Sequence, residues 1–230
     1  MADQLPNTVH VAAHPCLRAK LSQLRSSSTN AAETKRLVHE IATIIACEAL
    51  GRELWLIKRV PWVQDKSPLG YEYQTEGVTP SQISLIPILR SGLSMLDAVQ
   101  ALLPNPVSVH HLGMYRDKST LSAVEYYNNL PQHKTEDGAG RMDLAIIVDP
   151  IIATGSTICA AIETLKDWGA PRIICLSVLA TEGGLTRAAE VWPQGVDLYV
   201  GGVDPETDEY GMIKPGLGDI GDRLFLTVGK

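Results

Sequence analysis

The stretch Leu144–Thr157, LAIIVDPIIATGST, decides the fold of this chain. Residues 144–148 form an unbroken apolar run, which is typical of a strand buried on both faces of a parallel sheet. After Asp149 and Pro150 come two isoleucines, the small residues ATGST, and a helical pattern that continues through Lys166. The stretch therefore predicts a strand, a tight turn of small residues and the start of a helix.

The turn after this strand has the composition of an anion-binding site. The first turn of a helix presents free amide N–H groups and the positive end of the helix dipole. Thr154, Ser156 and Thr157 add hydroxyl groups. An ordinary strand–helix turn with a Ser or Thr N-cap is the alternative, but the acid at the strand end, Asp149, favours a phosphate site. A Walker A loop does not fit, because it needs a Lys after its second Gly and no Lys occurs before Lys166.

Apolar runs and helical patterns alternate along the rest of the chain. We expect helical patterns at residues 9–24, 32–50 (with a cap near Asn30), 93–103 and 184–192, and strands at 83–89, 107–113, 173–179 and 196–200. Alternation of this kind predicts an α/β fold with a doubly wound, mostly parallel sheet and ligands at the carboxyl ends of its strands. At this length, one domain over residues 1–230 is expected.

Two segments are expected to project from this sheet. Residues 53–75 contain two strand-like runs around PWVQDKSPLG and predict a β-hairpin arm. Trp55 and Trp62 would be exposed there on a monomer, which indicates a subunit contact unless both tryptophans cover the core. Residues 114–131 are too polar for a core and too long for a simple turn. They predict a mobile flap that carries Arg116, with a solvated loop as the alternative.

Two further candidate sites lie outside the Asp149 stretch. Arg90-Ser91-Gly92 follows the strand expected at 83–89, and small residues beside an Arg let backbone amides approach an anion; a helix start with a surface Arg is the alternative. Near the C-terminus, the glycine spacing Gly216-x-Gly218-x-x-Gly221 matches the dinucleotide-binding fingerprint. The match does not indicate dinucleotide binding, because the sequence lacks the strand that should precede the fingerprint and the second strand that should follow it. We interpret this segment instead as a rigid loop whose backbone groups can face a flat polar ligand.

Composition limits the partners and the compartment. The net charge of −6 and the pI near 5.5 argue against nucleic-acid binding. A membrane partner is not expected, because neither a membrane-length apolar run nor a signal peptide is evident in the sequence. The four cysteines are scattered without metal-ligand spacing, so reduced thiols, a cytoplasmic location and the absence of a protein-held metal site are expected.

Several segments together resemble the uracil branch of the type I phosphoribosyltransferases. These are PILRSG (residues 87–92), MYRD (114–117), the Asp-Pro form of the 149–157 loop, and KPGLGDIGDRLF (214–225), in the family's order from about His14 to the end. The sequence departs from the family pattern at Met212 (commonly Tyr), Ser156 (often Gly) and Thr181 (usually Pro). Whether Met212 changes the base pocket and its specificity stays open.

The resemblance implies transfer of phosphoribose from 5-phospho-α-D-ribose 1-diphosphate to uracil, which gives UMP and diphosphate. Arg116 and Asp149 would be the catalytic residues. The C-terminal segment 202–225 would be a hood over the base. The residues implied for phosphoribosyl diphosphate are Arg90, Arg116, Asp149, Pro150, Ile151, Ile152, Ala153, Thr154, Gly155, Ser156, Thr157 and Asp219, and those implied for uracil are Ile213, Gly218, Asp219 and Ile220.

The resemblance also implies partners and leaves two rival functions. Mg²⁺ would be carried with the diphosphate of the substrate, the chain would form a homodimer or higher homo-oligomer, and a GTP-type nucleotide is a candidate effector. One rival is a non-catalytic regulator of the same fold that senses phosphoribosyl diphosphate or a nucleotide. The other is a phosphoribosyltransferase for a different base.

Overall fold

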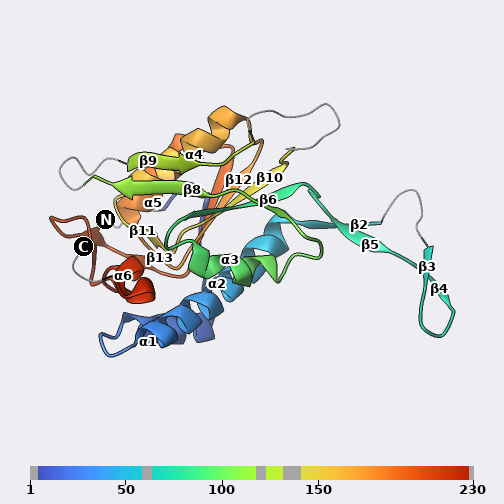
Figure 1. The fold of residues 1–230 in the computed structure, drawn as a ribbon, viewed down its shortest axis with the longest axis horizontal. Helices are drawn as coiled ribbons and strands as arrows, with labels where there is room; N and C mark the ends of the chain where they lie inside the picture. The colour runs from blue at the N-terminus through green and yellow to red at the C-terminus, as the bar shows by residue number, and fades with distance from the viewer. Residues whose placement is uncertain (1–4, 59–63, 118–122, 132–140, 228–230) are drawn as a thin grey trace.

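An eight-stranded, mostly parallel sheet forms the centre of the molecule (Figure 1). The structure is a computed structural model that describes residues 5–58, 64–117, 123–131 and 141–227. The strand order is β1 (Val9–Val11), β14 (Val196–Val200), β12 (Ile173–Ser177), β10 (Leu144–Val148), β6 (Ile83–Leu89), β8 (Leu112–Arg116) and β9 (Ala123–Asn128), and β7 (Ser108–Val109) also pairs with β6. Among the described residues of this sheet, only β8 and β9 pair antiparallel.

Helices cover both faces of the sheet, which confirms the predicted doubly wound arrangement. One face packs against α1 (Pro15–Arg25), α2 (Ala31–Glu53) and α3 (Leu93–Gln100), and the other packs against α4 (Ser156–Trp168) and α5 (Glu182–Val191). All five residues of β10 are buried between these two layers. The unbroken apolar run in the sequence therefore reflects burial on both faces. The described part of the chain contains no helix long and apolar enough to cross a membrane.

The N-terminal helical pattern begins later than predicted. Residues Val9–Val11 form β1, which pairs parallel with β14, and α1 starts only at Pro15. Proline fits the first position of a helix, where its missing N–H has no intrahelical partner, and it disfavours helix for the residue before it. The cap predicted near Asn30 is confirmed, because the Asn30 side chain accepts from Glu33 N at 3.0 Å.

Two predicted strands are each broken by a hydrogen bond to another segment. The strand predicted at 107–113 divides into β7 and β8, because the amide of His111 donates to the Asn129 side chain at 2.5 Å. The strand predicted at 173–179 divides into β12 and β13 (Leu179–Thr181), because the amides of Val178 and Leu179 both donate to the carbonyl of Pro150.

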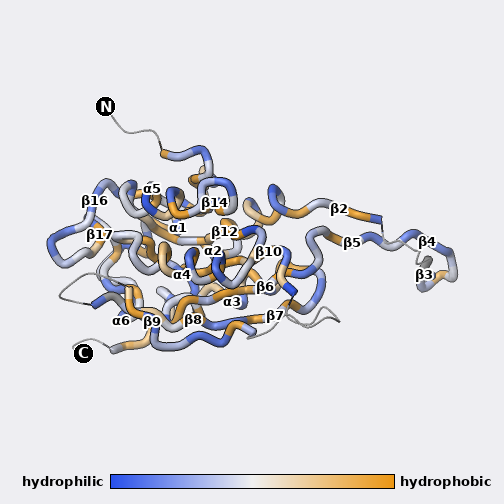
Figure 2. Tube along the Cα trace, turned by 90° about the horizontal axis from the view of Figure 1, so that it is seen from above, coloured by the Kyte–Doolittle hydropathy of each residue, from blue (hydrophilic) through white to orange (hydrophobic). Residues whose placement is uncertain are grey.

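The arm begins and ends later than predicted, because α2 continues through Glu53. β2 (Trp55–Lys58) pairs with β5 (Glu76–Thr79), and β3 (Gln64–Lys66) pairs with β4 (Glu72–Gln74), so the paired strands extend past residue 75 to Thr79. Figures 1 and 2 show the arm projecting far from the sheet. Trp55 is 62% exposed, so it does not cover the core. Trp62 lies outside the described residues.

The flap and the C-terminal segment flank the same edge of the sheet. β8 and β9 form the two strands of the flap as an antiparallel pair. Beyond the ends of β10, β12 and β14, a small parallel sheet forms from β11 (Ile151–Ile152), β13 and β15 (Val203–Asp204). β16 (Glu206–Thr207) then pairs with β17 (Ile213–Lys214), and α6 (Ile220–Phe225) follows. The part of the predicted loop at 220–225 is thus a short helix, because Asp219 caps it by accepting from Asp222 N.

Candidate active site

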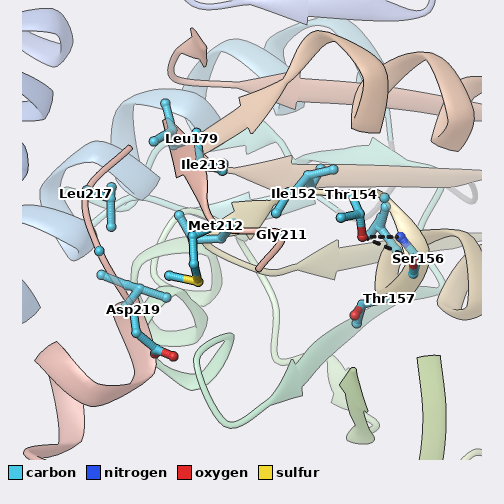
Figure 3. Close-up of a pocket in the computed structure, with 16 residues that line it drawn as sticks. Ile152, Thr154, Ser156, Thr157, Leu179, Gly211, Met212, Ile213, Leu217 and Asp219 are labelled. Carbon is cyan, nitrogen blue, oxygen red and sulfur yellow. Dashed lines mark hydrogen bonds between the residues drawn. The ribbon is translucent and has the colours of Figure 1, made fainter. Parts of the chain in front are cut away.

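A pocket of about 200 Å³ lies between the loop after β10 and the C-terminal segment. Figure 3 shows the hydroxyl-bearing Thr154, Ser156 and Thr157 at one end of it and the apolar Leu179, Ile213 and Leu217 toward the other. The full lining consists of residues 151–158, Leu179, residues 211–213 and residues 217–220. The loop after β10 and the C-terminal segment, which the resemblance assigns mainly to different substrates, therefore share one cavity. This cavity has a polar end and an apolar end.

The loop after β10 turns into α4 at a glycine. Gly155 has φ +83°, a left-handed conformation that side chains other than glycine rarely adopt. The hydroxyls of Thr154 and Ser156 lie 3.0 Å apart. The loop thus presents the N-terminus of a 13-residue helix together with neighbouring hydroxyl groups, which are the donors that a phosphate group requires.

Asp149 is buried beside this loop rather than in the pocket lining. It is 7% exposed, and Ser91 Oγ donates to its Oδ1 at 3.1 Å. Burial raises the pKa of Asp149 from about 3.8 to about 7, although the hydrogen bonds from Ser91 and from the backbone of Ile151 oppose the shift. A carboxyl group with this pKa changes charge near neutral pH. Pro150 also lies beside the pocket, and its carbonyl accepts the two bonds that divide β12 from β13.

The segment after β6 comes close to the loop after β10. The peptide bond between Leu89 and Arg90 is cis, and Gly92 N donates to Ile88 O at 2.9 Å. A Cβ on Gly92 would overlap the carbonyl oxygen of Val148, so only glycine allows this close approach. The small residues of the RSG segment therefore serve to pack two strand ends together.

The two arginines predicted for the site have different positions. Arg90 is exposed, and its guanidinium carbon lies 5.7 Å from the centroid of the Phe225 ring in α6. It stands beside the C-terminal segment, since a Cβ on Gly221 would lie 4.0 Å from Arg90 and 3.2 Å from Asp219 Oδ1. Arg116 ends β8, where its backbone pairs with Ala123. Its side chain lies outside the described part of the structure.

The C-terminal loop is built on two left-handed glycines. Gly216 has φ +62°, and Gly218 has φ +79°. A Cβ on Gly216 would overlap the carbonyl oxygen of Ile213, whereas a Cβ on Gly218 would meet only Arg223 Cδ at 3.8 Å. A side chain at position 216 is therefore excluded by the neighbouring backbone, whereas at position 218 the left-handed backbone alone favours glycine.

Arginines tie this loop to the N-terminal helix. Arg25 of α1 donates to both carboxylate oxygens of the buried Asp204, at 2.6 and 2.7 Å, and to the carbonyl of Gly216 at 2.7 Å. Arg223 donates to the carbonyls of Leu24 and Leu217, at 2.6 and 2.7 Å. The bonds from Arg25 and the bond from Arg223 to Leu24 join segments about 180 to 200 residues apart, and bidentate arginine contacts fix orientation as well as distance.

The structure adds pocket residues that sequence analysis missed. Ile158, Leu179, Gly211, Met212 and Leu217 line the pocket beside the predicted residues. Met212 had a signal in the sequence, since its departure from the family pattern raised the question of the shape of the base pocket. Leu179 ended a predicted strand, which placed it at the correct edge of the sheet. Among the described residues, no group of three or more His, Cys, Asp or Glu side chains is arranged to hold a metal ion.

The sheet, the glycine turn at α4 and the pocket define a phosphate-binding α/β protein. A family model described as uracil phosphoribosyltransferase matches residues 11–227. The chain belongs to the uracil phosphoribosyltransferase family.

Similar proteins agree with this assignment over nearly the whole chain. A protein named uracil phosphoribosyltransferase from Thermoanaerobacter is 40% identical over 219 residues, which cover 95% of this chain and 98% of the relative. A putative uracil phosphoribosyltransferase of Schizosaccharomyces pombe is 36% identical and covers 95% of this chain and 90% of the relative. The solved structure of the AQ2163 protein from Aquifex aeolicus has a TM-score of 0.82 and 29% identity, with 95% of this chain and 98% of that chain covered.

Proposed function

We propose that the protein transfers phosphoribose from 5-phospho-α-D-ribose 1-diphosphate to uracil and forms UMP and diphosphate. The observation that carries this proposal is one pocket in which residues 151–158 face residues 211–213 and 217–220, in a chain of the uracil phosphoribosyltransferase family. One end suits a phosphate and the other suits a small flat base. A donor and an acceptor of the phosphoribosyl group would therefore meet within one cavity.

The loop after β10 would hold the phosphoribosyl part of the donor. Amides and hydroxyls of residues 154–157 would bind the 5-phosphate at the start of α4, with Ile151, Ile152 and Ala153 forming the wall beside it. Asp149 would bind the ribose hydroxyls, and the adjoining Pro150 would keep the strand end in place. The position of Asp149 at the end of β10, two residues before the pocket-lining segment 151–158, supports this role.

The C-terminal loop would read the base. A site that separates uracil from cytosine must meet the donors and acceptors of the ring with fixed partners, and backbone groups are the most rigid ones available. Ile213 and the backbone of residues 218–220 line the pocket, and the arginine contacts at Gly216 and Leu217 hold them in place. Asp219 lies at the same rim and would stand next to the phosphoribosyl group.

Catalysis in this proposal depends on charge stabilisation and alignment. Breaking the bond from the sugar to the diphosphate develops positive charge on the ribose and negative charge on the leaving group. Arg90 and Arg116 would stabilise the diphosphate, and Mg²⁺ would arrive bound to its oxygens, which are the hard ligands that this ion prefers. Alignment of the base against the ribose by the two halves of the pocket would supply a further part of the rate.

The remaining expectations concern organisation and setting. We propose that residues 1–230 act as one phosphoribosyltransferase domain, with an arm at 55–79 in place of the predicted 53–75, a flap at 114–131 and a hood at 202–225. The exposed apolar side chains of the arm support association into a homodimer or a larger homo-oligomer. A cytoplasmic setting is consistent with four free cysteines, two of them exposed. A GTP-type effector stays a prediction.

An assay of diphosphate release with one base at a time tests the proposal. The purified protein, Mg²⁺ and phosphoribosyl diphosphate should release diphosphate and form UMP with uracil, and a chelator should abolish the reaction. Hypoxanthine, guanine, orotate and cytosine serve as alternative acceptors. Turnover with one of these and none with uracil would establish a different base, and binding of phosphoribosyl diphosphate without turnover on any base would establish a sensor.

A further inference from the structure

Two carbonyl groups of the loop after β10 accept hydrogen bonds from α5 and its N-cap residue. Thr181 Oγ1 donates to the carbonyl oxygen of Ala153 at 2.6 Å, and Arg187 donates to the carbonyl oxygen of Thr154 at 2.8 Å. The Thr181 hydroxyl also accepts from Gly184 N at 3.0 Å, so it is the N-cap of α5 at the same time. Two consecutive carbonyls of the loop are thus fixed by the N-cap residue of α5 and by a residue within α5.

These two bonds determine where the next amides point. In a trans peptide, the C=O and the N–H of the following residue point in opposite directions. When the carbonyl of Ala153 is directed toward α5, the amide of Thr154 is directed away from it. The same relation links the carbonyl of Thr154 to the amide of Gly155. Thr154 and Gly155 line the pocket on the other side of the loop.

The backbones of the loop and α5 also pack without side chains between them. A Cβ on Gly155 would lie 2.8 Å from the carbonyl oxygen of Gly184. A Cβ on Gly184 would overlap the carbonyl oxygen of Ala153 and lie 3.0 Å from Thr181 Oγ1. The start of α5 therefore supports the loop directly, and Thr181 is the buried polar side chain at the centre of this contact, at 3% exposure.

We propose that Thr181 is a positioning residue for phosphate binding, and that its hydroxyl, assisted by Arg187, keeps the amides of Thr154 and Gly155 directed at the 5-phosphate of the substrate. The inference rests on the proposed function for the identity of that phosphate. Carbonyl oxygens turned toward the pocket would repel an anion, so loss of the hydroxyl acts on the phosphoribosyl ligand and leaves the base end of the pocket unchanged. The family pattern usually has Pro here, which cannot make either of these side-chain bonds.

The test compares Thr181→Val, which keeps the shape and removes the hydroxyl, with Thr181→Ser, which restores it. Thr181→Val should raise KM for phosphoribosyl diphosphate about tenfold, as expected for one lost hydrogen bond, with uracil KM changed by less than about twofold. Thr181→Ser should stay within about twofold of the wild type for both substrates. Arg187→Gln, at an exposed position, should raise KM for phosphoribosyl diphosphate about threefold.

Two controls separate positioning from stability. Thr186→Val removes a hydroxyl from the same helix, where it bonds to Glu182 O, and should leave both KM values unchanged. Asn30→Ala removes the N-cap of α2, far from the pocket in sequence, and should lower the melting temperature without a change in KM. A Thr181→Val variant that behaves like Asn30→Ala, or one that raises both KM values equally, would overturn the inference.

Binding of ribose 5-phosphate, measured by calorimetry, gives a readout that does not need turnover. Its affinity should fall in Thr181→Val and Arg187→Gln and be restored in Thr181→Ser. A wild-type protein that binds ribose 5-phosphate but makes no UMP would refute the proposed function and leave this inference standing. Equal affinity in the wild type, Thr181→Val and Arg187→Gln would refute this inference and leave the proposed function standing. If Thr181→Val does not fold, the affinity of Arg187→Gln decides the outcome.

Discussion

The hydroxyl of Ser91 donates a hydrogen bond of 3.1 Å to Oδ1 of Asp149, and this bond joins residues 58 positions apart. Ser91 follows β6 and Asp149 follows β10, which are neighbours in the sheet. From β6 the chain adds β8 and β9 on one side and then returns to add β10, β12 and β14 on the other. The bond therefore crosses the point where the strand order reverses, which is where open α/β sheets bind their ligands.

The buried carboxyl of Asp149 should make stability depend on pH. It ionises near 3.8 when unfolded and near 7 when folded, so between these values the folded state binds more protons than the unfolded state. Stability should therefore fall as pH rises from about 4 to about 7, by on the order of 4 kcal/mol. Urea unfolding of the ligand-free protein across this range measures the effect.

Asp149→Asn should remove this pH dependence, because the amide oxygen can still accept the bond from Ser91 and carries no charge. The stability difference between the variant and the wild type should grow as pH rises. Asp97→Asn, at an exposed position on α3, serves as the control and should show little change. A wild-type curve that rises from pH 4 to pH 7 would contradict the proposed protonation of Asp149.

Arg116→Ala should lower kcat far more than it lowers stability. Arg116 ends β8, where the flap leaves the sheet, and the flap strand β9 has no fully buried residue. Loss of one charge-assisted contact to the leaving diphosphate is worth roughly 3 kcal/mol, on the order of a hundredfold in rate. Steady-state rates and melting curves measure the two quantities. Arg36→Ala is the control, because Arg36 is a surface arginine paired with Glu40. Near-normal turnover by Arg116→Ala would show that Arg116 is not part of the active site.

Association into at least a dimer should depend on the arm. Trp55, Leu56 and Ile57 are 62%, 68% and 40% exposed on consecutive positions of β2, which is unusual for a surface that contacts only water. Trp55→Lys should shift the light-scattering mass toward the monomer. Tyr210→Lys, at a side chain 71% exposed outside the arm, should not. A wild-type protein that is fully active as a monomer at assay concentration would contradict this prediction.

Sequence patterns located the elements whose signals are local. The strands Ile83–Leu89, Leu144–Val148 and Val196–Val200 have the bounds that their apolar runs predict. These runs are long because both faces of the sheet are covered, and they end at residues that cannot continue a buried strand. The phosphate-binding character of residues 149–157 was also readable, because the strand end, the small residues and the helix start are adjacent in the chain.

Features that depend on distant segments could not be read in the same way. The break at Val178 requires the carbonyl of Pro150, and the break at His111 requires the side chain of Asn129. Leu179 and Leu217 line one pocket only because the C-terminal segment folds back over β13. The contact between Thr181 and the loop carbonyl likewise joins residues 28 positions apart, and the sequence showed only that Thr181 departs from the usual residue.

Gly218 combines a left-handed backbone with a place in the pocket lining, and this combination makes a sharp test of base recognition. A methyl group in Gly218→Ala would strain the loop at φ +79° and shift the backbone that lines the base end of the pocket, so uracil KM should rise at least about tenfold. Binding of phosphoribosyl diphosphate depends mainly on residues 149–157 and should change little. Steady-state kinetics with each substrate varied in turn will measure both KM values.

Gly70→Ala is the matched control, because Gly70 has φ +84° and open space around it but lies in the arm. The same backbone strain should lower the melting temperature of Gly70→Ala, and both KM values should stay unchanged. Unchanged uracil KM in Gly218→Ala would mean that this backbone does not read the base, and an equal loss of both substrates would mean that the loop is structural.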